Sequence, residues 1–462
     1  MAHVLSRVLW LLLVTPASVL GQDRAPAPAD PLLDRLVSEA LEARPELSQA
    51  RSLVRAAEER VPQVGRLPDP ILTLGIQNDG FKEIQIGKME TSYWQIMATQ
   101  PLPWPGKLGL RADAAALDAK GAEASLDRVG LSVEADVRRA YLDLLLVRDR
   151  LKLLSRLEAL WTQSAGLART RYEVGDGPQS DLLRAQLELT RLRQRRLSLE
   201  ADERTRVQEL NRLRSHPLDE PIATTLSLRD LPDPPLLQLE ETRADAEARS
   251  PELAGARFGR EASERRLDLA RRERYPDFAV SAGVMPRGQL EPMWLLSVGI
   301  TLPVYGRQAH GVEEGLARER AAADGEEAVR QVLRLRVQER HVLLAALLPV
   351  VQLYRSGILV QSEATVASTT AQYKVGRVTF ASVLEALAGY LADVDGFLQA
   401  VSETQRVAIA QREVSLQATG GGGGAIGAAG FPGAGAMAAP AGGVASGAAQ
   451  TAEQGAAPMS RM

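Results

Sequence analysis

The sequence predicts a mainly α-helical fold with a transmembrane β component, built from two copies of one unit. Three observations support this prediction. Four short motifs recur in the same order about 200 residues apart, segments that alternate apolar and polar residues lie between the motifs, and very long helical stretches follow those segments. Aromatic residues make up only 4% of the 462 residues, which is low for a compact enzyme and typical of long helices rich in Ala, Leu, Glu and Arg.

The charge balance and the lack of cysteine argue against several classes of protein. The 55 Lys and Arg residues nearly cancel the 58 Asp and Glu residues, and the net charge of −3 supports neither general nucleic-acid binding nor an acidic disordered chain. Without cysteine we expect no disulfides, thiolate metal site, iron–sulfur cluster, cysteine nucleophile or lipidated N-terminal cysteine.

Residues 1–21 have the features of a secretory signal peptide. A short apolar run follows Arg7, and Val19 and Gly21 precede a cleavage site that we expect before Gln22. The run is too short for a bilayer core of about 30 Å, which needs about 20 residues. No other charge-free apolar stretch of 18 residues occurs before the Gly/Ala-rich end. We therefore expect membrane contact through a barrel or at the surface, not through a transmembrane helix.

An internal duplication divides the chain. The matched segments are 43–47 with 248–253, 66–69 with 274–277, 102–107 with 302–307, and 172–175 with 373–376. Four matches in one order at a nearly constant offset are hard to attribute to chance. The predicted organisation is a first repeat at 22–216, a Pro-rich joint at 217–235, a second repeat at 236–418 and a disordered Gly/Ala-rich tail at 419–462.

Each repeat carries two segments with the period of a β-strand. They are predicted at about 70–78, 92–102, 277–285 and 292–302. In the first segment Leu72, Leu74 and Ile76 form an apolar face, while residues 73, 75 and 77 between them are Thr, Gly and Gln. Strands of a transmembrane barrel have this pattern, because one face meets lipid and the other meets water. An ordinary half-buried hairpin is the alternative.

Aromatic residues lie near both ends of these segments. Trp104, Tyr275 and Tyr305 fall at one end of the predicted hairpins, and Trp94 and Trp294 lie towards the other end. Aromatic girdles at the two membrane interfaces would have this arrangement. The sequence therefore predicts these five side chains as membrane-interface aromatics.

Long helical hairpins are predicted at about 107–215 and 307–416. Their apolar residues alternate in steps of three and four, which is coiled-coil spacing. A continuous helix of either first arm would be about 100 Å long. We expect Pro349 to bend the second arm. Matched arms of this length suit struts rather than the packing helices of a compact enzyme.

From about residue 30 to 418 the sequence resembles the TolC-like outer membrane efflux proteins, the exit ducts of tripartite efflux pumps. The resemblance rests on the duplication, on Leu67–Pro70, on Gln100–Lys107 and on two Tyr-x-x-Gly turns at 172–175 and 373–376. The motifs of the first repeat are most similar to the heavy-metal branch of the family. No single motif is specific, but four in order behind a signal peptide are.

The resemblance implies a homotrimer in the cell outer membrane. Each chain would supply four strands to a twelve-stranded barrel, which continues as an α-helical tunnel in the periplasm. A separate physical argument agrees, because four strands cannot close a barrel with a lumen and an open sheet in lipid leaves unpaired edges. The implied partners are outer membrane lipid, a periplasmic adaptor and an inner-membrane pump of the resistance-nodulation-division type. Polar and small residues would face the lumen, namely Thr73, Gln77, Ser297, Gly299 and Thr301.

The two Tyr-x-x-Gly turns are the main candidate functional sites. Gly175 and Gly376 suit the positive φ that ends a helix, and Asp181 suits the first turn of the next helix. These turns could be plain connectors between helices. The resemblance implies periplasmic tips that dock the adaptor, with the candidate residues Tyr172, Val174, Gly175, Asp181, Tyr373, Val375 and Gly376. It also places Glu385 at the tunnel constriction, where three copies would form a carboxylate ring that favours cations.

The sequence offers no signature of an enzyme, a cofactor site or a metal site. His216, His310 and His341 are isolated, and no phosphate-binding loop, nucleophile elbow or zinc-protease motif occurs. We therefore predict a passive duct for metal ions or small toxic compounds. A periplasmic coiled-coil adaptor or scaffold that never enters lipid is the alternative. It would explain the helices and the signal peptide, but not the duplicated amphipathic hairpins.

Overall fold

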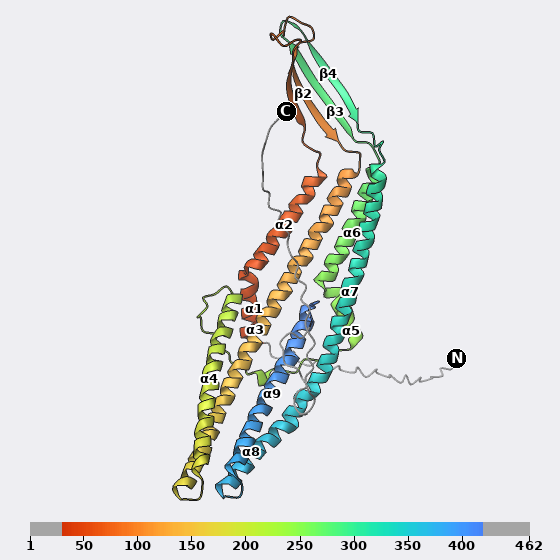
Figure 1. The fold of residues 1–462 in the computed structure, drawn as a ribbon. Coiled ribbons are helices and arrows are strands. Elements are labelled where there is room, and N and C mark those ends of the chain that lie inside the picture. Colours follow the sequence, from red (N-terminus) through yellow and green to blue (C-terminus); the bar gives the residue numbers. More distant parts are fainter. Residues whose placement is uncertain (1–29, 419–462) are drawn as a thin grey trace, which may run out of the picture. The chain divides into compact units, whose positions relative to one another are not determined.

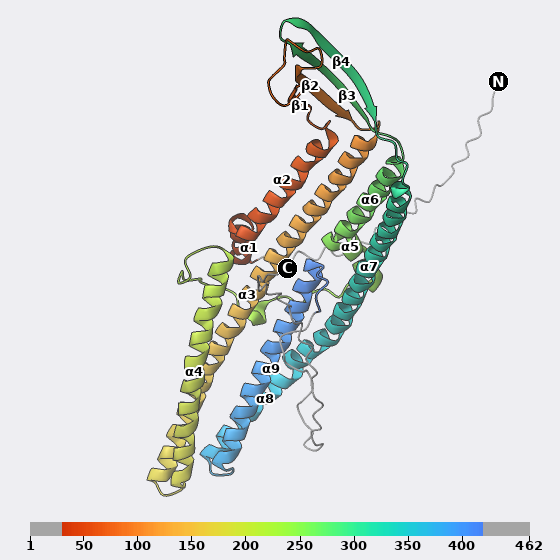
Figure 2. The same cartoon turned by 45° about the horizontal axis from the view of Figure 1, so that its top comes forward.

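The computed structural model describes residues 30–418 (Figure 1). The predicted signal peptide and the predicted tail lie outside these residues. Within them the fold is mainly α-helical with one four-stranded antiparallel sheet, which confirms the predicted fold class. The sheet lies at one end of the long helices, and the turns that join the long helices in pairs lie at the other end (Figures 1 and 2).

The first repeat contains two short helices, a strand pair and a long helical hairpin. Its elements are α1 (Pro31–Ala43), α2 (Pro45–Gly65), β1 (Ile71–Gln77), β2 (Tyr93–Leu102), α3 (Lys107–Glu173) and α4 (Gln179–Leu213). Asp30 caps α1 by accepting a hydrogen bond from the Leu32 amide, and proline begins both short helices. The short 3₁₀-helix η1 (Leu228–Asp230) lies in the joint that follows.

The second repeat has the same order of elements. They are α5 (Leu239–Arg249), α6 (Pro251–Arg272), β3 (Phe278–Arg287), β4 (Leu290–Ile300), α7 (Arg307–Leu353), the π-helix η2 (Tyr354–Ile358), α8 (Leu359–Lys374) and α9 (Phe380–Glu413). Gly106 and Gly306 precede α3 and α7 with φ of 88° and 70°. This left-handed conformation is accessible to glycine at little cost, so both repeats turn sharply from strand to helix at the same motif.

The hairpin between β3 and β4 is tighter than the sequence predicted. We expected strands at about 277–285 and 292–302, but β3 extends to Arg287, β4 begins at Leu290 and ends at Ile300, and residues 288 and 289 form the turn. Gly288 has a φ of 66°, which a two-residue hairpin turn requires and which period-two counting does not register.

The second arm is interrupted after Pro349, not at it. α7 continues through Pro349 to Leu353, and the π-helix η2 follows at once. The expected irregularity is therefore present but lies five residues later. Gly396 of α9 makes room for it, because a Cβ atom on this glycine would lie 2.7 Å from the Tyr354 hydroxyl. A π-helical turn interrupts the regular hydrogen bonding of a long α-helix and is frequent at functional sites.

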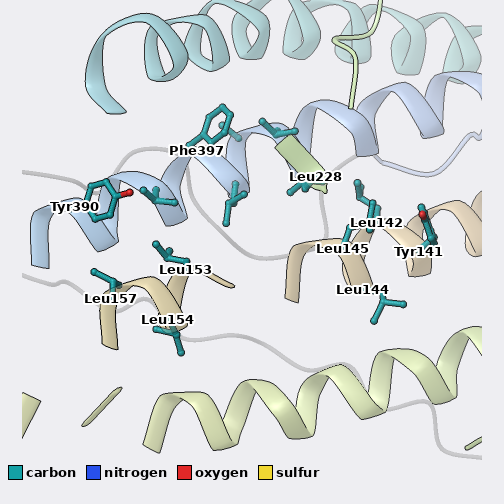
Figure 3. Close-up of a cluster of buried hydrophobic side chains, with 14 of the residues drawn as sticks. Tyr141, Leu142, Leu144, Leu145, Leu153, Leu154, Leu157, Leu228, Tyr390 and Phe397 are labelled. Carbon is teal, nitrogen blue, oxygen red and sulfur yellow. The ribbon is translucent and has the colours of Figure 1, made fainter. Parts of the chain in front are cut away.

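The core runs along α3, which contacts α1, α2, α4, α6 and α9. Figure 3 shows Leu153 of α3 on the side of α9 that carries Tyr390, whereas Leu154 faces α4. Apolar residues of α3 spaced by three and four thus pack against two neighbouring helices, since α3 lies between α4 and α9. This packing holds both helical hairpins in one unit.

One helical run, Arg307–Lys374, is long and apolar enough to cross a membrane by length and composition alone, although most of its apolar window is not buried in the single chain. The charge-free stretch 342–354 spans only about 20 Å as a helix, which is short of the bilayer core of about 30 Å. We therefore do not assign this run to the bilayer.

Candidate functional site

The sheet separates apolar from small and polar side chains. In register, Leu74 lies opposite Ile96, Ile96 opposite Val284, and Val284 opposite Trp294. These four side chains are exposed, with 78% of Trp294 accessible. On the other face Thr99 and Ser281 share a hydrogen bond of 2.9 Å. Among residues 30–418 no helix covers the apolar face. An exposed apolar surface of this size is unfavourable in water, so we expect lipid or another protein to cover it.

Four of the five predicted interface aromatics lie at the two ends of the sheet, whereas Trp294 lies near the middle of β4. At the helix end Trp104 stacks on Tyr275 with ring centroids 5.2 Å apart, and Tyr305 is fully exposed. At the other end Trp94 lies opposite Ile76, and Trp294 lies further into the sheet, opposite Val284. Their role at a membrane interface stays a prediction.

An ion pair between a buried lysine and a partly exposed aspartate fixes the junction between the sheet and the helices. Lys107, only 3% exposed, donates hydrogen bonds of 2.8 Å to a carboxylate oxygen of Asp277 and to the carbonyl of Tyr275. The same oxygen of Asp277 accepts from the Trp104 amide at 2.7 Å. Burial of an ammonium group requires such compensation, so this contact ties the end of β2 to the start of β3.

Arg171 and Tyr373 join the two helical tips. The Arg171 guanidinium donates to the carbonyls of Tyr373 and Asp176 at 3.1 and 3.2 Å, and it lies over the Tyr373 ring at 5.0 Å. The Asp181 carboxylate lies close enough to the Tyr373 hydroxyl to act on it electrostatically. Burial, together with the charge of Asp181, raises the pKa of Tyr373, so its hydroxyl remains a donor at neutral pH. We call Arg171, Asp181 and Tyr373 the tip cluster.

The predicted tip residues therefore divide into two groups. Tyr172 is 44% exposed and Val174 and Val375 are also exposed, whereas Tyr373 is only 2% exposed and packs on Phe380. Gly175 and Gly376 both have positive φ, 83° and 73°, as expected at helix ends. Only the exposed group offers a surface to a partner.

Glu385 lies on the second turn of α9 and is exposed. It is near the tips along the sequence but takes no part in the tip cluster. Arg171 is not among the residues predicted from the sequence, and only its position beside the Tyr-x-x-Gly turn could have pointed to it. Its main partner is about 200 residues away in the chain, so local pattern does not show the contact.

No group of three or more His, Asp or Glu residues within 30–418 could hold a metal ion. A groove of about 390 Å³ lies between α3, α8 and α9 above the tips, lined by apolar side chains such as Leu160 and Val366. Arg156 crosses it to pair with Glu363 at 2.5 Å. The groove is a surface feature between helices and holds no set of converging catalytic groups.

Comparison with known proteins agrees with this architecture. The sequence profile of the outer membrane efflux protein family matches residues 36–215 and 243–417, which is most of the chain and both repeats. No curated protein matches the chain.

The fold is similar to those of several solved outer-membrane channels. The outer-membrane channel OprN superposes with a TM-score of 0.69 at 21% identity, covering 83% of this chain and 90% of that one. CusC gives 0.72 at 18% identity, covering 84% and 93%. The open state of the MtrE channel of Neisseria gonorrhoeae gives 0.71 at 17% identity, covering 84% and 89%. On the match of the family profile over both repeats, the chain belongs to the outer membrane efflux protein family.

Proposed function

We propose that the chain is the outer membrane subunit of a tripartite efflux system. Three copies would form a passive duct that carries metal ions or small toxic compounds to the exterior. An inner-membrane pump of the resistance-nodulation-division type and a periplasmic adaptor would deliver the substrate. The observation that carries this proposal is the sheet, which is apolar and exposed on one face, small and polar on the other, and open at β1 and β4.

The trimer is supported by the unfinished sheet and by an exposed helical surface. Three chains with four strands each supply twelve strands, enough to enclose a water-filled passage. Exposed apolar side chains on α7 and α8, including Val342, Leu353 and Val360, need cover of their own. Since the charge-free part of this run, residues 342–354, is too short to span lipid, we assign the cover of these side chains to a neighbouring chain.

The exposed tip residues would receive the adaptor. Tyr172, Val174 and Val375 project from two neighbouring turns whose backbones the tip cluster holds together. A small apolar surface of this kind suits the apolar face of a partner helix. The groove between α3, α8 and α9 begins just above it and could extend the contact.

The tip cluster would keep the tunnel closed, and Tyr373→Phe tests this together with the duct itself. Loss of the hydroxyl removes its interaction with the nearby Asp181 carboxylate but leaves the ring under Arg171. A hydroxyl that faces a charged group contributes about 1.5 kcal/mol per chain, so with three chains the ratio of open to closed channels should rise at least tenfold. Single-channel recording in planar bilayers would measure this ratio.

Tyr172→Phe is the matched control, because Tyr172 occupies the same place in the first turn but is exposed. It should gate like the wild type. Absence of any channel from the wild-type protein would refute the proposed duct. Wild-type gating in Tyr373→Phe would refute only the role of the cluster.

Glu385 would contribute a cation-attracting ring at the constriction. Glu385→Gln removes three charges from the trimer, so we expect a lower preference for cations in reversal-potential measurements across a salt gradient. Glu261→Gln, an exposed change on α6 remote from the tips in sequence and fold, should leave selectivity unchanged. Equal selectivity in wild type and Glu385→Gln would exclude Glu385 from the constriction.

A further inference from the structure

The two repeats are equivalent residue by residue in the sheet. In β1 and β2, Leu72 lies opposite Ala98 and Leu74 opposite Ile96. Adding 208 to each β1 number and 200 to each β2 number gives Val280 opposite Val298 and Ala282 opposite Leu296, and β3 and β4 pair in this register. Every pair of residues between β1 and β2 thus corresponds to a pair between β3 and β4.

Two strand pairings between the repeats are possible in such a sheet, and the sheet of this chain contains only one of them. β2 of the first repeat pairs with β3 of the second, and the junction beside it is closed by the ion pair of Lys107 and Asp277. The reverse contact, from the end of the second repeat to the start of the first, would join β4 to β1. These are the two edge strands of the sheet, so no single chain can make it.

The residues for the reverse contact are present and keep their charges. Arg307 corresponds to Lys107 by the offset of 200, and Asp69 corresponds to Asp277 by the offset of 208. Lys107 is buried by its partner repeat, whereas Arg307 and Asp69 are both exposed. Within one chain they flank opposite edges of the sheet, and the two edge strands are about 14 Å apart at the strand spacing of about 4.8 Å.

We propose that Arg307 of one chain pairs with Asp69 of a second copy, as Lys107 pairs with Asp277 inside the chain. β4 would then lie beside β1 of that copy in the register carried over from β2 and β3, with Val298 opposite Leu74 and Gly299 opposite Thr73. The inference rests on the proposed trimeric channel and specifies its subunit contact.

The carried-over register is consistent with the faces of the sheet. Val298 and Leu74 are both exposed on the apolar face, and Gly299 and Thr73 are small residues on the other face. A slip of one residue would place Val298 opposite Thr73 or Gly75 and interrupt both faces. The register that the internal repeat dictates is therefore one that a continuous lipid-facing band also requires.

Cysteine cross-linking tests the register, because the chain has no cysteine of its own. A chain with Thr73→Cys and Gly299→Cys carries the two thiols on the edge strands, about 20 Å apart, because three strand spacings and four residues along β4 separate them. A disulfide needs a Cα separation of 4.4 to about 6.8 Å, so only neighbouring chains can link. We expect mild oxidation to give covalent trimers on non-reducing gels. The pair Thr73→Cys with Leu295→Cys is the control, since four residues along β4 move the thiol by about 14 Å, and it should not link.

A charge exchange tests the ion pair. Arg307→Asp and Asp69→Arg should each lower the fraction of trimer in detergent roughly tenfold, and the double exchange should restore it. Native mass spectrometry would measure the three fractions. A wild type that is monomeric in membranes and detergent would refute the proposed channel. A trimeric wild type without the Thr73–Gly299 link, or a double exchange that does not recover, would overturn this subunit contact alone.

Discussion

Replacing Glu413 by alanine should destabilise the protein by about 3 kcal/mol. Glu413 is the last residue of α9, is 6% exposed, and accepts hydrogen bonds from Arg128 at 2.9 Å and from Arg139. Arg128 also reaches Glu252 at the start of α6, at 3.2 Å. Removal of one partner from a largely buried charge network leaves cations without compensation, which costs about 3–5 kcal/mol when burial is complete.

The loss would affect more than one helix end, since arginines also hold the residues after α9. Arg336 donates to the Leu416 carbonyl at 3.0 Å, and Arg340 donates to the carbonyls of Ser415 and Gln417. Burial lowers the pKa of Arg340 to about 10, so this group remains charged at neutral pH. α9 carries much of the core that faces α3, so we expect unfolding of its end to destabilise the whole core.

Thermal or denaturant unfolding in detergent, followed by far-UV circular dichroism, would measure the change. Glu188→Ala is the matched control, because Glu188 pairs with Arg191 one turn along the exposed face of α4 and should contribute under about 0.5 kcal/mol. Similar losses for the two variants would contradict the assigned weight of the Glu413 network.

Leu296→Arg should impair assembly in the outer membrane. Leu296 lies on the apolar face near the middle of β4, opposite Ala282. An arginine on the lipid face of a barrel costs about 2–4 kcal/mol per chain near the bilayer midplane, and a trimer carries three of them. We expect much less folded protein in the outer membrane fraction, with the rest degraded or retained in the periplasm.

Ser297→Arg is the neighbouring control on the small and polar face. If that face lines water, the variant should insert normally and change conductance by adding positive charge to the lumen. Equal loss of insertion in both variants would show that the two faces do not differ in their surroundings. Normal insertion of Leu296→Arg would remove the lipid-facing assignment of the apolar side.

Membership of the outer membrane efflux protein family settles three broader points. The chain is an outer membrane protein, it acts as a channel component, and it is not an enzyme. This decides against the alternative of an adaptor or scaffold that stays out of lipid. The predicted resemblance to TolC-like proteins is confirmed by the same match. The substrate and the pump stay proposals.

Local sequence pattern was sufficient for much of the fold. Period-two alternation located the four strands, because each strand presents one face to each environment and neighbouring residues therefore differ in polarity. Apolar spacing by three and four located α3 and its counterpart arm for the corresponding reason. The duplication was visible because both repeats keep the same proline and glycine residues at their turns.

The sequence by itself determined the fold class, the two repeats and the family. The tertiary structure decided which member of each matched pair is buried: Tyr373 and Lys107 are enclosed, while Tyr172 and Arg307 are exposed. Equivalent motifs give equivalent backbone turns, because φ, ψ and local polarity are set nearby in the chain. Burial and ion pairing depend on what packs alongside, and here the partner lies about 200 residues away or, as we propose for Arg307, in another chain.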